Sequence, residues 1–194
     1  MIDQRAFEQI RQTLEKEDEM REVLIKKSRD ILKLSKKAIY AFHRDDSEGA
    51  ESLLSQAQSA IAEVSPMVCA HQSMLFVGAY NEALEEYVEA RCYQSFLNGQ
   101  ALPTPAQLKV QPDVYLLGVC DLTGELLRKA INSATKGDVA IAFKIKDFVT
   151  ELYGQLMLFD FRNSLLRRKF DRIKYVMEKL EDLGLQLTLK GQKA

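Results

Sequence analysis

The chain has 194 residues, 46% of them hydrophobic, with four prolines, nine glycines and a formal charge of −1 at pH 7. This length and apolar content are sufficient for a substantial core. A nearly neutral chain is not one of the polycations that bind nucleic acid indiscriminately. The charge is nevertheless segregated. Residues 45–90 contain nine acids and no Lys or Arg, whereas the charged residues of 21–44 and 162–179 are mainly basic. A basic surface and an acidic site can therefore occur in one chain.

Three cysteines, Cys69, Cys92 and Cys120, lie far apart within apolar helical segments. They form no CxxC pattern and their odd number fits no disulfide framework, so we expect small buried side chains. The first residues show no apolar signal-peptide segment, and no apolar run approaches the roughly 18 residues of a membrane span. We therefore expect a cytoplasmic protein in a reducing compartment, with no membrane partner.

Helical periodicity runs through the first half of the chain. Residues 3–43 contain neither Gly nor Pro and predict one helix of about 60 Å, a length typical of a spine or an assembly interface. A turn and N-cap at residues 45–47 precede a second predicted helix over residues 52–64. Ser65-Pro66 is predicted to begin a third helix that reaches about Asn98, with Gly99 as its stop.

The second half shows the same periodicity after a loop. Residues 99–112 carry three of the four prolines and predict this loop, although Thr104-Pro105 can cap one short helical turn. Three further helices are predicted over residues 113–134, 138–159 and 162–183, with Gly137 closing the first and Gly184 the last. The polar residues 188–194 are expected to fray. The predicted fold is all-α, a single domain over residues 1–194 with six or seven helices.

Two acidic pairs are the main chemical feature of the sequence: Glu86 with Glu89, and Asp121 with Glu125. Spacings of three and four residues place both carboxylates of a pair on one helix face. If the two helices are neighbours, four carboxylates converge and require a cation such as Mg²⁺, which takes oxygen ligands. A plain solvated face has the same periodicity and is the commoner explanation of such spacing. Residues 82–89, however, contain four Glu and no Lys or Arg that would support a solvated helix.

Other catalytic schemes find little support. The chain has only two histidines, His43 and His71, and lacks both HExxH and Glu-x-x-His, so neither a zinc protease nor a ferritin-type di-iron site is available. Neither GxGxxG nor GxxxxGK[ST] occurs, which excludes nucleotide chemistry through those loops. No GxSxG elbow points to a serine hydrolase.

Three stretches carry a specific resemblance. Residues 78–90 (GAYNEALEEYVEA) and 118–128 (GVCDLTGELLR), the latter followed by INS and GD, resemble the catalytic factor-X branch of the translin family. Residues 165–175 (LLRRKFDRIKY) resemble the last helix of the translin branch, and residues 18–22 match more weakly. These stretches occur in the same order as in the family and extend over most of the chain.

The resemblance implies a seven-helix α fold that assembles into hollow octamers and binds single-stranded nucleic acid inside. Members of the factor-X branch are Mg²⁺-dependent endoribonucleases, and their catalytic and metal-binding acids fall here on Glu86, Glu89, Asp121 and Glu125. The implied cofactor is Mg²⁺, with Mn²⁺ as a substitute, and the implied partner is single-stranded RNA, with DNA left open. The short chain resembles a stand-alone homo-oligomer, such as those of archaea, and a translin-like second subunit stays open.

The same resemblance implies RNA contacts on two basic helices. Translin's arginine in the first helix falls on Arg21, and its basic residue in the last helix falls on Arg168. Nearby basic residues in the last helix are further candidates for RNA binding: Lys169, Arg172 and Lys174. Translin's histidine-containing contact segment aligns near Val77 and Ala79, so that part of its RNA site is not carried over. Tyr87 and Tyr93 are candidates for base stacking, although core packing fits Tyr87 better.

Three functions follow from these observations. The first is a metal-dependent endoribonuclease that cuts single-stranded RNA inside a hollow homo-oligomer, with largely sequence-independent RNA binding. The second is a non-catalytic oligomer that binds single-stranded RNA or DNA. The third is a helical scaffold whose long first helix and acidic face recruit protein partners.

Overall fold

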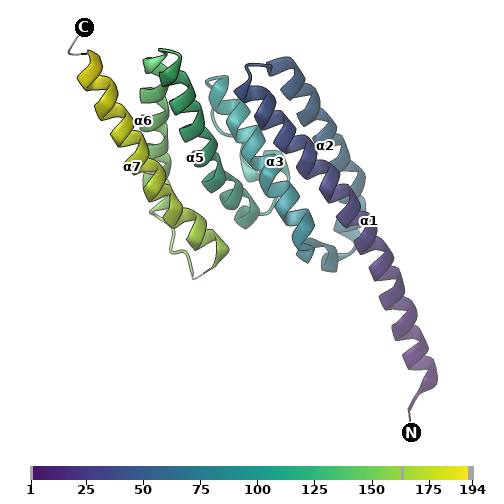
Figure 1. The fold of residues 1–194 in the computed structure, drawn as a ribbon. Coiled ribbons are helices and arrows are strands. Elements are labelled where there is room, and N and C mark those ends of the chain that lie inside the picture. Colours follow the sequence, from purple (N-terminus) through teal and green to yellow (C-terminus); the bar gives the residue numbers. More distant parts are fainter. Residues whose placement is uncertain (1, 163, 192–194) are drawn as a thin grey trace. The chain divides into compact units, whose positions relative to one another are not determined.

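The computed structural model describes residues 2–162 and 164–191, and in this part of the chain the regular secondary structure is entirely helical (Figure 1). Seven α-helices and one 3-10 helix follow in order: α1 (Gln4–His43), α2 (Ser47–Ala70), η1 (Gln72–Phe76), α3 (Gly78–Leu97), α4 (Pro105–Leu108), α5 (Pro112–Thr135), α6 (Val139–Leu156) and α7 (Leu165–Gly191). The predicted all-α fold with six or seven helices is confirmed.

The chain divides into two compact units, Met1–Ala90 and Arg91–Ala194. The boundary between them falls within α3. The single domain expected over residues 1–194 stays a prediction, and the two units are described separately below.

In the first unit, α1 and α2 pack along a seam with a seven-residue period. α1 buries Leu24, Ser28, Ile31, Ser35, Ala38 and Phe42 along this seam, and α2 buries Ala50, Leu54, Ala57, Ile61, Val64 and Val68. Both sets alternate steps of four and three residues, the spacing of left-handed coiled-coil packing. Asp46 starts α2 as its N-cap by accepting a hydrogen bond from the Gly49 N–H at 2.9 Å. The seam therefore fixes the second half of α1 against α2.

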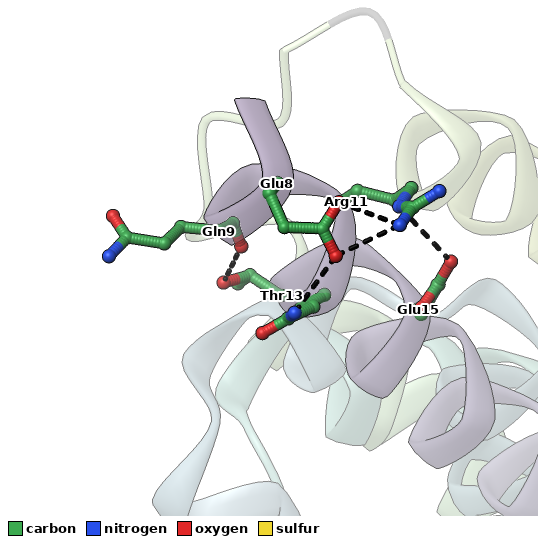
Figure 2. A network of polar contacts seen from close by, with 6 residues as sticks. Glu8, Gln9, Arg11, Thr13 and Glu15 are labelled. Carbon is green, nitrogen blue, oxygen red and sulfur yellow. Dashed lines mark hydrogen bonds and ion pairs between the residues drawn. The ribbon is translucent and has the colours of Figure 1, made fainter. Parts of the chain in front are cut away.

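The first half of α1 is supported differently. Residues 4–23 contain no buried side chain, and this part of the helix extends beyond α2 (Figure 1). The Glu8 carboxylate accepts hydrogen bonds from Arg11 at 2.6 Å and from Gln12 at 2.9 Å, while Arg11 lies 3.9 Å from Glu15 (Figure 2). Arg11 thereby lowers the pKa of Glu8. Local pairs three and four residues apart therefore support the start of this segment.

The predicted helix break at Ser65-Pro66 is wrong. α2 begins at Ser47, continues through Pro66 and ends at Ala70, and α3 begins only at Gly78 after the 3-10 helix. Proline removes one backbone donor, but the Ser65 hydroxyl donates to the Ile61 carbonyl at 2.7 Å. Because Val64 and Val68 continue the buried seam on both sides of Pro66, packing outweighs the lost hydrogen bond.

In the second unit, α5, α6 and α7 pack against one another in pairs. The buried side chains of this core include Leu122, Leu126 and Ala130 on α5, Ala142, Ile145 and Val149 on α6, and Phe170, Ile173, Val176 and Leu180 on α7. The rings of Tyr153 and Phe170 stack with centroids 5.3 Å apart, which joins the end of α6 to the start of α7. This three-helix core sets the position of α7 relative to α5.

Of the three helix ends predicted at glycines, two are confirmed and one is wrong. Gly99 and Gly137 follow α3 and α5 with φ of 67° and 88°, so their predicted role as helix stops is confirmed. Gly184 lies inside α7, which continues to Gly191, because Gly184 is itself a buried position of this helix, beside Phe143 of α6. Residues 188–191, expected to fray, are helical, and residues 192–194 of the predicted tail lie outside the described residues.

The structure also tests the predictions made for the loop, the cysteines and membrane-spanning helices. Thr104 and Gln107 form a capping box that starts α4, which confirms the short turn within the loop. Cys92 and Cys120 are buried as expected, but Cys69 is exposed, and none of the three forms a disulfide bond. No helix in residues 2–162 or 164–191 is long and apolar enough to cross a membrane. The cytoplasmic location stays a prediction.

Candidate functional site

The first acidic pair lies on α3. Because Gly78–Leu97 is one α-helix, Glu86 and Glu89 share a face. Glu89 is only 7% exposed, so an ordinary solvated face is the wrong description of this carboxylate. Lys36 of α1 lies 3.8 Å from Glu86, although the lysine side chain is 58% exposed. A positive charge absent from the local sequence thus comes from another helix.

The second acidic pair lies on α5 and is closely compensated. Asp121 and Glu125 are both half-buried. The Lys169 ammonium of α7 donates a hydrogen bond to Asp121 Oδ2 at 2.5 Å, and the lysine side chain is 13% exposed. Arg128, one turn along α5 and mostly exposed, lies 3.7 Å from Glu125. The two acidic pairs therefore have similar spacing but different surroundings.

Lys169 occupies a position that the sequence analysis did not anticipate. It was grouped with RNA-binding residues, whereas the structure places it against a carboxylate of the second acidic pair. The signal was available, because Lys169 precedes Ile173 by four residues and Val176 by seven and so shares their buried stripe. A lysine on a buried stripe requires a counter-charge. Its contact with RNA stays a prediction.

The other basic candidates on α7 are exposed. Arg168 and Arg172 share one face with Tyr175, which is 60% exposed, and the Lys179 ammonium lies 5.3 Å from the centre of the Tyr175 ring. Lys174 is also exposed but points to another face of the helix. Tyr175 was not among the residues predicted from sequence, although its position seven residues after Arg168 puts it on the basic face.

Arg21 lines a cleft of about 280 Å³ in the first unit. Glu17 and Asp18 line the same cleft, so its charge is mixed and not simply basic. Phe76 is 84% exposed at this cleft, and Val77, which aligns near the contact segment of translin, also contributes to its wall. Phe76 is a second exposed aromatic residue that the sequence analysis missed.

The two tyrosines proposed for base stacking are not at the surface. Tyr87 is buried, which confirms the expectation of core packing. Tyr93 is completely buried, so its predicted stacking on a base is wrong. Burial raises the pKa of Tyr115, whose side chain forms a hydrogen bond with Cys92 in the second unit.

The carboxylates are suitable donors for a hard cation, but the described residues of each unit form no complete metal cluster. Within each unit, the described residues contain no group of three or more His, Cys, Asp or Glu side chains placed to hold an ion. An all-oxygen donor set suits Mg²⁺ or Mn²⁺ better than Zn²⁺. The donor chemistry of Glu86, Glu89, Asp121 and Glu125 therefore fits the cation implied by the family resemblance.

Fold and site together define an all-helical protein with two carboxylate pairs and an exposed basic helix face. The translin family description matches residues 19–191, and the chain belongs to this family. Translin-associated protein X of Mus musculus is 29% identical over an alignment covering 96% of this chain and 78% of that protein. Translin of Homo sapiens is 36% identical over 77 residues, 40% of this chain and 34% of that protein.

Solved structures agree with this assignment. The structure of AfC3PO in complex with duplex RNA has a TM-score of 0.88 and 27% identity, covering 95% of this chain and 97% of that chain. The apo-NeC3PO structure has a TM-score of 0.86 and 26% identity, covering 96% of this chain and 98% of that chain. The structural similarity therefore covers nearly all of this chain and nearly all of each solved chain.

Proposed function

We propose that this protein is a Mg²⁺-dependent endoribonuclease that cuts single-stranded RNA as a homo-oligomer. Membership of the translin family and the extensive similarity to translin-associated protein X support this proposal. The observation that carries it is Glu89, a carboxylate only 7% exposed and three residues from a second carboxylate. Burial of a carboxylate is costly, and a cation site is a physical reason to retain one.

In this proposal Glu86, Glu89, Asp121 and Glu125 are the catalytic and metal-binding residues. When bound, Mg²⁺ or Mn²⁺ would supply an activated water and offset charge on the scissile phosphate. The task of the four side chains is to present oxygen atoms on rigid helices. Neighbouring cations on the protein, such as Lys36 and Lys169, limit the negative charge that accumulates in the metal-free state.

RNA attraction is assigned to basic side chains outside the acidic pairs. The proposed contacts are Arg21, Arg168, Lys169, Arg172 and Lys174, which would neutralise phosphates with little sequence preference. Because one structural neighbour was solved with duplex RNA, the preference for single strands needs a direct comparison. That comparison includes single-stranded RNA, duplex RNA and single-stranded DNA.

The proposed activity is tested with end-labelled RNA of one sequence as a single strand and as a duplex, together with single-stranded DNA. We expect the full chain to cut the single-stranded RNA in Mg²⁺ or Mn²⁺ and not in EDTA. Glu89→Gln should lose cleavage, while the matched control Glu82→Gln, an exposed acid on the same helix, should retain it. Persistent cutting by the Glu89→Gln protein would overturn the assignment.

Base stacking is proposed for Tyr175, because it is exposed between basic side chains on α7. Tyr175→Ala should weaken binding of single-stranded RNA by about 1–2 kcal/mol, the scale of one lost stacking contact. Tyr40→Ala is the matched control, since Tyr40 is also an exposed tyrosine near a cation, with Arg44 at 5.9 Å from its ring. Fluorescence anisotropy in EDTA measures binding without cleavage, and equal loss in both variants would contradict the assignment.

A non-catalytic RNA-binding oligomer is the second candidate function. One observation favours it: Lys36, Arg128 and Lys169 already place positive charge near the acidic residues. In such a protein the ion pairs would be structural and no cation would be needed. Salt-dependent RNA binding with no cleavage in any metal would support this candidate over the nuclease.

The homo-oligomer, an octamer by family resemblance, is also part of the proposal. The exposed half of α1 carries Phe7, Ile10 and Leu14 at spacings of three and four residues, an apolar stripe that contact with another chain would cover. Light scattering coupled to sizing chromatography measures the assembled mass. A monomer or dimer that binds no RNA at low salt would favour the helical-scaffold alternative, and a translin-like partner chain can be added in the same experiment.

A further inference from the structure

Lys169 carries a positive charge that is largely removed from water in the second unit. Its side chain is 13% exposed, and its ammonium donates to Asp121 Oδ2 at 2.5 Å. The lysine precedes the buried Phe170 directly and lies on the stripe that continues to Ile173. An ammonium in such surroundings is stabilised by a nearby carboxylate, and Asp121 supplies one.

We propose that Lys169 is a built-in counter-ion of Asp121 that leaves the carboxylate when a divalent cation binds there. The inference rests on the proposed function, since Asp121 is one of the acids assigned to Mg²⁺. Two cations repel each other at short distance, most strongly where little water separates them. Lys169 is thus a positioning residue that sets the affinity of Asp121 for metal. Once released, its ammonium is available to an RNA phosphate.

Two further ion pairs described at these acids, each within one unit, lack the features that support this role. Lys36 lies 3.8 Å from Glu86 and is 58% exposed, and Arg128 lies 3.7 Å from Glu125 and is also mostly exposed. Water screens such pairs and stabilises the cation after separation. Competition with metal is therefore assigned to Lys169 and not to Lys36 or Arg128.

Displacement is measured first on the wild-type protein. The full chain is treated with an amine-reactive acetylating ester in EDTA and in saturating Mg²⁺, and mass spectrometry follows each lysine. We expect acetylation of Lys169 to become several-fold faster in Mg²⁺, while Lys179, an exposed lysine on the same helix, reacts at the same rate in both. An unchanged or slower rate at Lys169 would overturn the proposal.

Metal affinity provides the second measurement. Calorimetric titration with Mg²⁺ should show about tenfold tighter binding to Lys169→Met than to the wild type, because a competing charge is removed. Lys179→Met loses the same charge from an exposed position and should bind Mg²⁺ as the wild type does. Equal or weaker binding by Lys169→Met would also overturn the proposal.

Thermal unfolding separates displacement from a purely structural role. Lys169→Met should unfold at a lower temperature than the wild type in EDTA, and saturating Mg²⁺ should remove most of that difference. A purely structural salt bridge predicts a difference that Mg²⁺ leaves unchanged. If the variant folds too poorly for titration, the acetylation measurement on the wild-type protein still decides the proposal.

RNA cleavage by the wild type distinguishes failure of this inference from failure of the proposed function. Mg²⁺-dependent cleavage without faster acetylation of Lys169 would retain the nuclease and reject the counter-ion. Tighter Mg²⁺ binding by Lys169→Met without any RNA cleavage would retain the counter-ion and reject the nuclease. If the wild type does not cleave RNA and Lys169 shows no sign of displacement by Mg²⁺, both the nuclease and the counter-ion are rejected.

Discussion

The two acidic pairs share a helical spacing but differ in how their charge is accommodated. On α3, Glu89 is buried, and Glu86 faces an exposed lysine at 3.8 Å. On α5, Asp121 is held by a largely buried lysine at 2.5 Å. An exposed lysine contributes little to a carboxylate because water competes with it, whereas a buried lysine depends on its partner. The comparison teaches that spacing places carboxylates on a face, while the elements packed around them decide their energetics.

The largest expected effect comes from removing one carboxylate from each pair. We expect Glu89→Gln and Asp121→Asn each to slow RNA cleavage about 100-fold or more, equivalent to about 2.7 kcal/mol in the barrier. If both pairs serve one chemical step, the double variant should be little slower than either single variant. Single-turnover cleavage rates measure this, with RNA affinity in EDTA as the control. Additive losses would show that the two pairs act independently.

A smaller effect is expected when the lysine partners are removed. Lys169→Met should lower the free energy of unfolding in EDTA by about 1–2 kcal/mol, less than for a fully buried pair because Asp121 is half-buried. Lys36→Met should change it by about 0.5 kcal/mol or less, since that lysine is mostly exposed. Chemical denaturation at fixed protein concentration measures both. Equal losses would contradict the difference drawn between the two pairs.

The smallest effect is expected at Arg128. This side chain lies one helical turn from Glu125, at 3.7 Å, and is mostly exposed. Arg128→Gln should therefore change the free energy of unfolding by about 0.5 kcal/mol or less, as is typical of pairs on one helix surface. The same denaturation series in low and high salt provides the measurement. A loss of unfolding free energy as large as that of Lys169→Met would mean that distance and exposure do not predict how much each ion pair stabilises the fold.

Errors in the predicted boundaries show where local signals are insufficient. Pro66 and Gly184 predicted helix boundaries, yet both lie inside helices, because the apolar period of α2 continues past Pro66 and Gly184 is itself a buried position of α7. Gly99 and Gly137 did end their helices, since each takes a left-handed conformation where that period stops. The periodicity of the surrounding residues is thus a stronger guide than a single proline or glycine.

Exposed aromatic residues were the main omission from the candidate site. Tyr87 and Tyr93 were the candidates for base stacking, although core packing was favoured for Tyr87, and both are buried. Tyr175 and Phe76, which are exposed near basic side chains, were overlooked. Helical phase relative to Arg168 identifies Tyr175 from sequence. Phe76 and Arg21, in contrast, line one cleft only because the chain around η1 lies beside the first helix.

The sequence by itself determined the all-α class, most helices and the pairing of carboxylates on single helix faces, because these features depend on residues three or four positions apart. The tertiary structure decided the environment of each pair. The burial of Glu89 and the contact between Asp121 and Lys169, separated by 48 residues, arise from packing between helices. No local period encodes such a contact, since it depends on how the buried stripes of α5 and α7 meet.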